Sequence, residues 1–199
     1  MITTHDSTGY GLHNVKGENT MTLNDIIVSS LAQLGRGHDI QTLDAYRRKF
    51  TYYANIAQSE IAEALGIFRT DKLEAPLGRV NLGQLPRHCR KVIKVVQRGN
   101  SVPFRIGDRS DELFLPYDTA ALITYNYEPS ALKCAGDVSE IDEEFHGLIV
   151  SYIVGRERMS GDVSTQRGAN LYLSMYESSK NKLRRHKGES DSYTIFNRY

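Results

Sequence analysis

The hydrophobic period of this chain changes twice, near residue 66 and again near residue 139. Before residue 66, apolar side chains recur at alternating threes and fours, as on one face of an α-helix. Residues 66–129 instead contain all five prolines and short β-branched or aromatic runs, which favour strands and turns. Helical spacing then returns. The pattern predicts an α+β fold, a mainly α-helical bundle of about four helices with an inserted small antiparallel β lobe.

Two helices are predicted before the lobe. Thr22 begins the first, with Asp25 placed three residues later as in a capping box, and Gly35 and Gly37 end it. The second helix is predicted over residues 42–65, about 35 Å long at ~1.5 Å per residue. Its apolar positions are Leu43, Tyr46, Phe50, Tyr53, Ala57, Ile61 and Ala64.

Four short runs predict the strands of the lobe, at residues 91–96 (KVIKVV), 102–106 (VPFRI), 112–117 (ELFLPY) and 121–127 (ALITYNY). Turn-forming residues at 98–101 and 107–110 separate the runs. This spacing predicts a meander of hairpins.

A further helix is predicted to begin at Ser139, a suitable N-cap residue. The carboxylates that follow would face the positive end of the helix dipole; they are Glu140, Asp142, Glu143 and Glu144. The main apolar stripe comprises Ile141, Phe145, Leu148, Ile149, Tyr152 and Ile153. Val150 and Val154 fall on another side, so we expect this helix to be covered on more than one face.

The last helix follows a break at residues 161–162 and carries Leu171, Tyr172, Met175, Tyr176 and Leu183. The predicted organisation is therefore a flexible N-terminal arm (1–20), a helical bundle (21–65 and 139–186), the β lobe (66–129) and an extended C-terminal tail (187–199).

Composition restricts the function classes. The formal net charge is only +1, so the whole chain offers no strong electrostatic attraction to nucleic acid or to an anionic membrane. No apolar run approaches the ~20 residues that span a bilayer, and the first residues lack a secretory-signal profile. Synthesis in a cytoplasm and no membrane partner are expected. Cys89 and Cys134 are expected to be free thiols.

The sequence contains none of the motifs that mark a nucleophile elbow, a phosphate-binding loop or a zinc protease site. Three weaker groupings remain: His88 and Cys89 with Cys134 and His146, the Asp142–His146 pair, and the acidic turn at Asp108, Asp111 and Glu112. Loop, core and surface roles explain each better than metal or catalytic roles. We expect no enzyme activity, no catalytic, cofactor or metal site, and no cofactor.

Two terminal features are candidates for partner binding. The basic run Lys180, Lys182, Arg184, Arg185 and Lys187 either complements the end of a helix dipole or forms a surface for DNA or another partner. The tail ends with Tyr193, Ile195, Phe196, Arg198 and Tyr199, residue types that are enriched at the centres of protein interfaces. The tail either docks on a partner or folds back on its own domain.

The order of these segments resembles the head-to-tail adaptor (connector) proteins of tailed bacteriophages, in their podophage-like form with a β insertion. The similarity covers residues 21–186. It is carried by TLNDIIVSSLAQLGR, the strand ending ITYNYEP, the acidic start and LIV core of SEIDEEFHGLIVSYIVGRERMSGDVS, and the last helix with Tyr172, Tyr176, Glu177 and Leu183. The β insertion is longer than the loop of the smaller helical adaptors.

The resemblance implies a structural virion protein of the phage neck, made in the host cytoplasm. It implies a dodecameric ring that binds the portal protein, offers a docking platform for tail or nozzle proteins in tail assembly, and lets genomic DNA pass without sequence specificity. The tail residues 193–199 would lie on the portal, and Val150 and Val154 would contact the neighbouring subunit of the ring. Head-completion or tail-terminator proteins and a cytoplasmic nucleic-acid-binding regulator are the alternatives, with a hydrolase as a third class.

Overall fold

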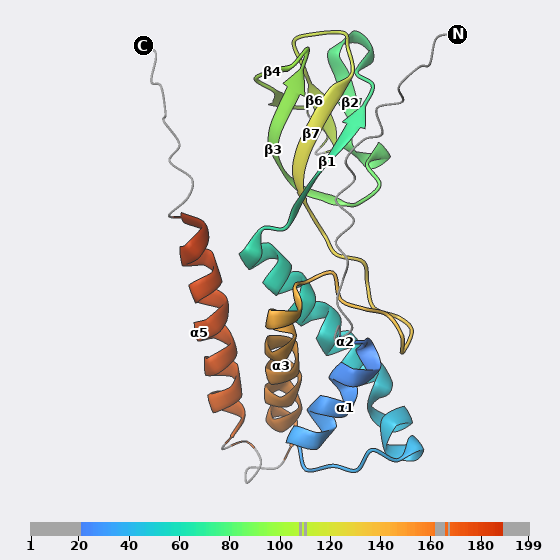
Figure 1. The fold of residues 1–199 in the computed structure, drawn as a ribbon, viewed down its shortest axis with the longest axis vertical. Coiled ribbons are helices and arrows are strands. Elements are labelled where there is room, and N and C mark those ends of the chain that lie inside the picture. The colour runs from blue at the N-terminus through green and yellow to red at the C-terminus, as the bar shows by residue number, and fades with distance from the viewer. Residues whose placement is uncertain (1–20, 108, 110, 162–165, 167, 189–199) are drawn as a thin grey trace, which may run out of the picture.

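The computed structural model describes residues 21–107, 109, 111–161, 166 and 168–188. These residues form four α-helices and two small antiparallel sheets, so the predicted α+β fold is confirmed. Figure 1 shows an elongated molecule in which the sheets form a lobe beyond one end of the helices. No helix of the described part has both the length and the apolar character needed to cross a bilayer.

Helix α1 (Leu23–Gln33) begins with the predicted capping box. The Asp25 amide donates to Thr22 Oγ1 at 3.2 Å, and the Thr22 amide donates to Asp25 Oδ2 at 2.9 Å. Helix α2 (Ile40–Leu65) begins two residues before the predicted start, because the Asp39 carboxylate caps it by accepting from the Thr42 amide at 3.0 Å. Gly66 ends α2 in the left-handed conformation, φ 60°.

Helix α3 (His146–Met159) begins later than predicted, after the 3-10 turn η3 (Glu143–Phe145). Ser139 is not its N-cap. The Ser139 side chain is buried, where its hydroxyl donates to Gln58 Oε1 at 2.7 Å and ties the chain before α3 to α2. The remaining helix of the described chain, α5 (Ala169–Gly188), runs back along α3 in the opposite direction (Figure 1).

The helical core is contributed by every helix of the bundle. Its fully buried members include Leu23, Ile26, Leu31, Phe50, Ile61, Ile149, Ile153 and Tyr176. Helix α3 is the central element because α1, α2 and α5 all pack against it. Its burial on several sides explains why apolar residues occur around so much of its circumference.

The lobe lies between α2 and α3 in the chain and has two sheets. One has the strand order β1-β7-β3-β4, built from β1 (Phe68–Leu73), β3 (Cys89–Gln97), β4 (Asn100–Ser101) and β7 (Ala121–Tyr127). The other has the order β2-β6-β5, built from β2 (Arg79–Asn81), β5 (Arg105–Ile106) and β6 (Glu112–Phe114). The short 3-10 turns η1 (Pro76–Gly78) and η2 (Leu82–Gln84) flank β2.

The predicted hairpins at residues 98–101 and 107–110 connect paired strands, but the prediction of a simple meander is wrong. The last strand, β7, lies at the centre of its sheet between β1 and β3. Strand β1 was missed because its sequence, FRTDKL, is polar. Its inward-facing Arg69 and Asp71 neutralise each other, with Arg69 Nε 2.6 Å from Asp71 Oδ2.

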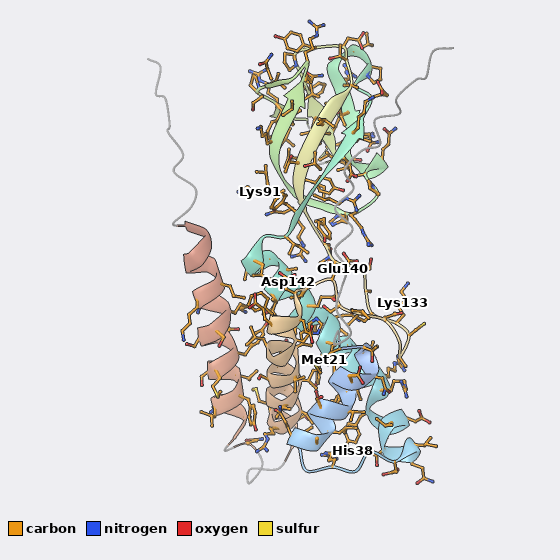
Figure 2. The ribbon with its side chains drawn as sticks, in the orientation of Figure 1. Met21, His38, Lys91, Lys133, Glu140 and Asp142 are labelled. Carbon is orange, nitrogen blue, oxygen red and sulfur yellow. The ribbon has the colours of Figure 1, made fainter. Side chains whose placement is uncertain are left out.

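The lobe has its own hydrophobic core, which shares no residue with the helical core. Its buried members are Ala75, Val80, Leu85, Val95, Leu113, Leu115, Ala121, Ile123 and Tyr125. Ion pairs link the lobe to the helices: Arg87 Nη2 lies 2.8 Å from Glu140 Oε1, and Arg90 Nη1 lies 3.6 Å from Glu63 Oε2. The molecule therefore has two cores joined through a polar junction, where Figure 2 labels Glu140.

Candidate interaction surfaces

Helices α3 and α5 make the most extensive contact between two helices of the described chain. The rings of Tyr152 on α3 and Tyr176 on α5 lie with centroids 4.9 Å apart. Gly155 on α3 allows the close approach of α5, because a Cβ atom there would lie 2.8 Å from Leu173 Cδ2. The two helices are thus joined by an aromatic contact and by a glycine contact that a larger residue would disturb.

A polar cluster around the buried Lys180 and Tyr176 fixes α5 to α2. Lys180 Nζ lies 2.6 Å from Glu60 Oε2 and 2.8 Å from Glu177 Oε1, and the Tyr176 hydroxyl donates to Glu60 Oε2 at 3.0 Å. Burial lowers the pKa of Lys180, but the hydrogen bonds and charges of Glu177 and Glu60 raise this pKa overall. Burial, and then the charge of Glu60, raise the pKa of Tyr176 strongly. Lys180 is therefore charged and Tyr176 neutral at physiological pH.

This cluster corrects the interpretation of the basic run. Lys180 is only 8% exposed and belongs to the intramolecular contact between α5 and α2, so it is not available as a partner surface. Lys182 is exposed. The side chains of Arg184, Arg185 and Lys187 lie outside the described residues. Glu60 was not identified from the sequence, since no local pattern links it to a lysine on the last helix.

The expectation for Val150 and Val154 is also corrected. Both belong to the helical core of their own chain, with exposed fractions of 2% and 0%. The helices α1, α2 and α5 supply the cover that was expected from a neighbouring subunit. Neither valine is available for an inter-subunit contact in this conformation.

The outward side of α5 carries an apolar pair that its inward contacts leave uncovered. Leu171 and Met175, one helical turn apart, are 62% and 55% exposed. Their spacing is visible in the sequence, but the sequence does not show which apolar positions of this helix face the core. The structure assigns the core to Tyr176 and the surface to Leu171 and Met175.

The histidines and cysteines that were weighed as a metal or thiol site have separate local environments in the structure. Cys89 and Cys134 are free thiols, half-buried and exposed respectively. His146 is buried, with Nε2 3.0 Å from the Ile141 carbonyl oxygen. His88 Nδ1 lies 3.4 Å from Glu128 Oε2 at the surface. Across the residues that the structure describes, no three His, Cys, Asp or Glu side chains converge as metal ligands.

The acidic residues that were considered as metal or catalytic groups lie at the surface where the structure describes them. Asp142 is exposed in the turn before η3, and Asp111 is exposed beside the half-buried Glu112 at the β5–β6 hairpin. Asp108 lies outside the described residues. So do the whole arm 1–20 and the tail residues Tyr193, Ile195, Phe196, Arg198 and Tyr199.

Comparisons of the chain with protein-family models and with the sequences of curated proteins find no match. Function is therefore inferred from the residues and their arrangement.

Proposed function

We propose that this chain is a structural virion protein, the head-to-tail adaptor subunit of a tailed bacteriophage. In this role its copies assemble side by side into a ring on the portal vertex. The ring offers a platform to tail or nozzle proteins and leaves a passage for genomic DNA. The subunit acts by its shape and its contacts, without a chemical step.

The observation that carries the proposal is the apolar outer side of α5. Leu171 and Met175 project from a helix whose other side is already fixed by Tyr152, Glu60 and the helical core. Exposed large apolar side chains on an ordered helix are typical of protein contact surfaces. In a closed ring each subunit presents two different surfaces to its two neighbours, so this side of α5 would meet a different surface of the next copy.

The elongated shape supports the same role. The lobe lies beyond one end of the bundle, and α5 runs toward that end along the flank of the molecule (Figure 1). A subunit of this kind can contact its neighbours along the bundle while its ends remain available to partners above and below. The resemblance in residues 21–186 provides the identity of those partners, the portal on one side and the tail on the other.

The proposal is tested by sedimentation velocity of the chain mixed with the portal protein of the same phage. We expect the unmodified chain to co-sediment with the portal as a multi-copy complex. Leu171→Asp with Met175→Asp should prevent this, because the new charges would be buried between copies. Asn170→Asp with Asn181→Asp is the matched control, since it adds the same charge on a different strip of α5 and should leave the complex intact. Equal behaviour of the two variants would contradict the assignment.

A further inference from the structure

The outer face of the four-stranded sheet in the lobe is formed by three rows of side chains. The register places Lys72, Leu122 and Val96 in one row across β1, β7 and β3. Thr70, Thr124 and Lys94 form the next row. Phe68, Asn126 and Lys91 form the third, at the end nearest the helices, where Figure 2 labels Lys91. Side chains alternate along β1 and β7, so the intervening residues of these strands face the lobe core. In β3 the register shifts between Cys89 and Lys91 and between Val92 and Lys94, and Ile93 is also exposed, at 40%.

Burial agrees with this assignment. Lys72, Lys91 and Lys94 are exposed, as are Phe68 and Leu122, at 65% and 46%. The inward-facing Ile123 and Tyr125 are completely buried. We refer to the surface formed by Lys72, Lys91, Lys94, Phe68 and Leu122 as the lysine face.

The lysine face carries positive charge only. None of its nine row positions is an Asp or a Glu. The neighbouring carboxylates lie at its margins: Glu74 Oε1 is 3.7 Å from Lys72 Nζ in an exposed pair, and Glu63 is paired with Arg90. Within the described residues, Lys91 and Lys94 form no ion pair. An exposed pair such as Lys72–Glu74 contributes little and leaves that lysine able to exchange partners.

Three arginines at the core and base of the lobe, in contrast, form ion pairs within the chain. Arg69 is bound to Asp71, Arg87 to Glu140, and Arg90 to Glu128, each within 3.3 Å. The cations left free on the lysine face are thus mobile point charges on long stems. An ammonium group on a flexible stem can follow phosphates that are met in variable positions, because it binds them as a point charge without a fixed geometry.

We propose that the lysine face binds the phosphate backbone of nucleic acid without sequence specificity. Adjacent strands are about 4.8 Å apart, so Lys72 on β1 and Lys94 on β3 are separated by about 10 Å across the sheet. Three lysines at this spacing can each reach a different phosphate of one DNA segment. Contacts to phosphates position a protein on nucleic acid but carry no sequence information, so a face of lysines would bind without reading base edges.

This inference deepens the proposed function and rests on it for the identity of the nucleic acid as the DNA that passes the ring. It assigns the DNA contact to the lobe, in place of the basic run on α5 whose first lysine is buried. Contacts through a few lysines would be weak and salt-dependent, which suits a passage through which DNA must move.

The test is fluorescence anisotropy of the isolated full chain with a short mixed-sequence duplex and with a single strand of the same length. We expect both to bind at low salt, because the phosphate chemistry is shared. For three phosphate contacts, affinity for the duplex should fall about 40-fold between about 50 and 200 mM salt. The variant Lys72→Glu, Lys91→Glu, Lys94→Glu should lose about tenfold or more of the affinity at low salt.

The matched control is Arg79→Glu, Arg105→Glu, Arg109→Glu, which reverses the same number of exposed charges elsewhere on the lobe, in or next to the other sheet. It should bind duplex within about threefold of the unmodified chain, since it leaves the lysine face intact. An equal loss in both variants, or no duplex binding by the unmodified chain, would overturn the proposal. Binding confined to the single strand and abolished by Phe68→Ala would also overturn it, because base stacking would then replace phosphate contact.

Circular dichroism establishes that each variant is folded, and portal co-sedimentation separates this proposal from the proposed function. A lysine-face variant that forms the portal complex but does not bind DNA supports both. A chain that binds DNA through the lysine face yet never joins the portal would retain the DNA site and contradict the adaptor role.

Discussion

Lys180 and Glu60 form the closest polar contact between α5 and α2, with Nζ 2.6 Å from Oε2 and the lysine side chain 10% exposed. The pair lies beside the Tyr152 and Tyr176 rings, which are tilted by 57° to each other, so the middle of α5 is held by charge and by aromatic packing together. Removing the lysine takes away the charged partner of Glu60, whose own side chain is 37% exposed, and also the packing of the lysine stem against α2 and Tyr176.

Lys180→Ala is therefore expected to lower the free energy of unfolding by about 1–3 kcal/mol. Lys182→Ala, two residues along the same helix and exposed, should change it by less than about 0.5 kcal/mol. Urea denaturation followed by circular dichroism measures both. Similar values for the two variants would show that the Glu60 contact contributes no stability.

Val154 provides a test of the corrected core. Because its side chain is fully buried, Val154→Asp should destabilise the isolated chain by more than about 3 kcal/mol. Ser151→Asp, on a more exposed side of α3, should have a much smaller effect. If Val154→Asp instead left the isolated chain stable and impaired only assembly, the valine would face a neighbour and the core assignment would be wrong.

Substitutions at Gly78 and Gly35 distinguish two sources of destabilisation by a side chain, an unfavourable backbone conformation and a steric clash. Both have positive φ angles, 69° and 67°, but a Cβ on Gly78 would lie 2.4 Å from the Leu115 carbonyl oxygen, whereas Gly35 has open space. Gly35→Ala should cost about 1 kcal/mol from backbone conformation alone. Gly78→Ala should cost roughly 1–3 kcal/mol more, from the steric clash.

Hydrogen exchange locates the effect of Gly78→Ala. Because the lobe and the bundle have separate cores, amide protection should fall in β2, β6 and β7 and remain in α2 and α3. A uniform loss across both parts would mean that the two cores unfold as one unit.

Asp71 predicts a pH dependence. Burial raises the pKa of this carboxyl, but its hydrogen bonds with Arg69 and Tyr125 outweigh burial and lower the pKa below the ordinary value. A lowered folded-state pKa gives stability that is present above about pH 4 and is lost as the pH falls through the folded value. Asp71→Asn should reduce stability at neutral pH and flatten the acid limb of the stability profile.

Thermal unfolding between neutral pH and acid measures this effect. Asp44→Asn is the control, because the Asp44 side chain is 68% exposed and forms only a surface pair with Arg47. An acid limb unchanged by Asp71→Asn would exclude the Arg69–Asp71–Tyr125 contact as a source of stability.

Local features of the fold could be predicted from the sequence. The capping box at Thr22 and Asp25 depends on residues three apart, and the hairpin turns depend on their own glycines. Non-local contacts could not. Ser139 has the character of an N-cap, but its hydroxyl is bonded to Gln58, 81 positions away. The pairing of β1 with β7, which creates the lysine face, likewise joins the two ends of the lobe sequence.

The candidate interaction residues show the same difference between local patterns, which the sequence reveals, and non-local contacts, which it does not. The sequence indicates that α3 is apolar on more than one side, yet not whether its own chain or a second copy provides the cover for Val150 and Val154. The sequence contains Lys180 but does not indicate that this lysine is buried and paired with Glu60. The apolar pair Leu171 and Met175 could be recognised as exposed only after the inward side of α5 was known.

Electron microscopy of the chain mixed with its portal protein tests the central claim most directly. The adaptor role predicts a second ring, coaxial with the portal, in which each copy presents α5 to its neighbour and the channel continues through both rings. Portal particles with no added ring, or copies bound singly without contact between them, would contradict it.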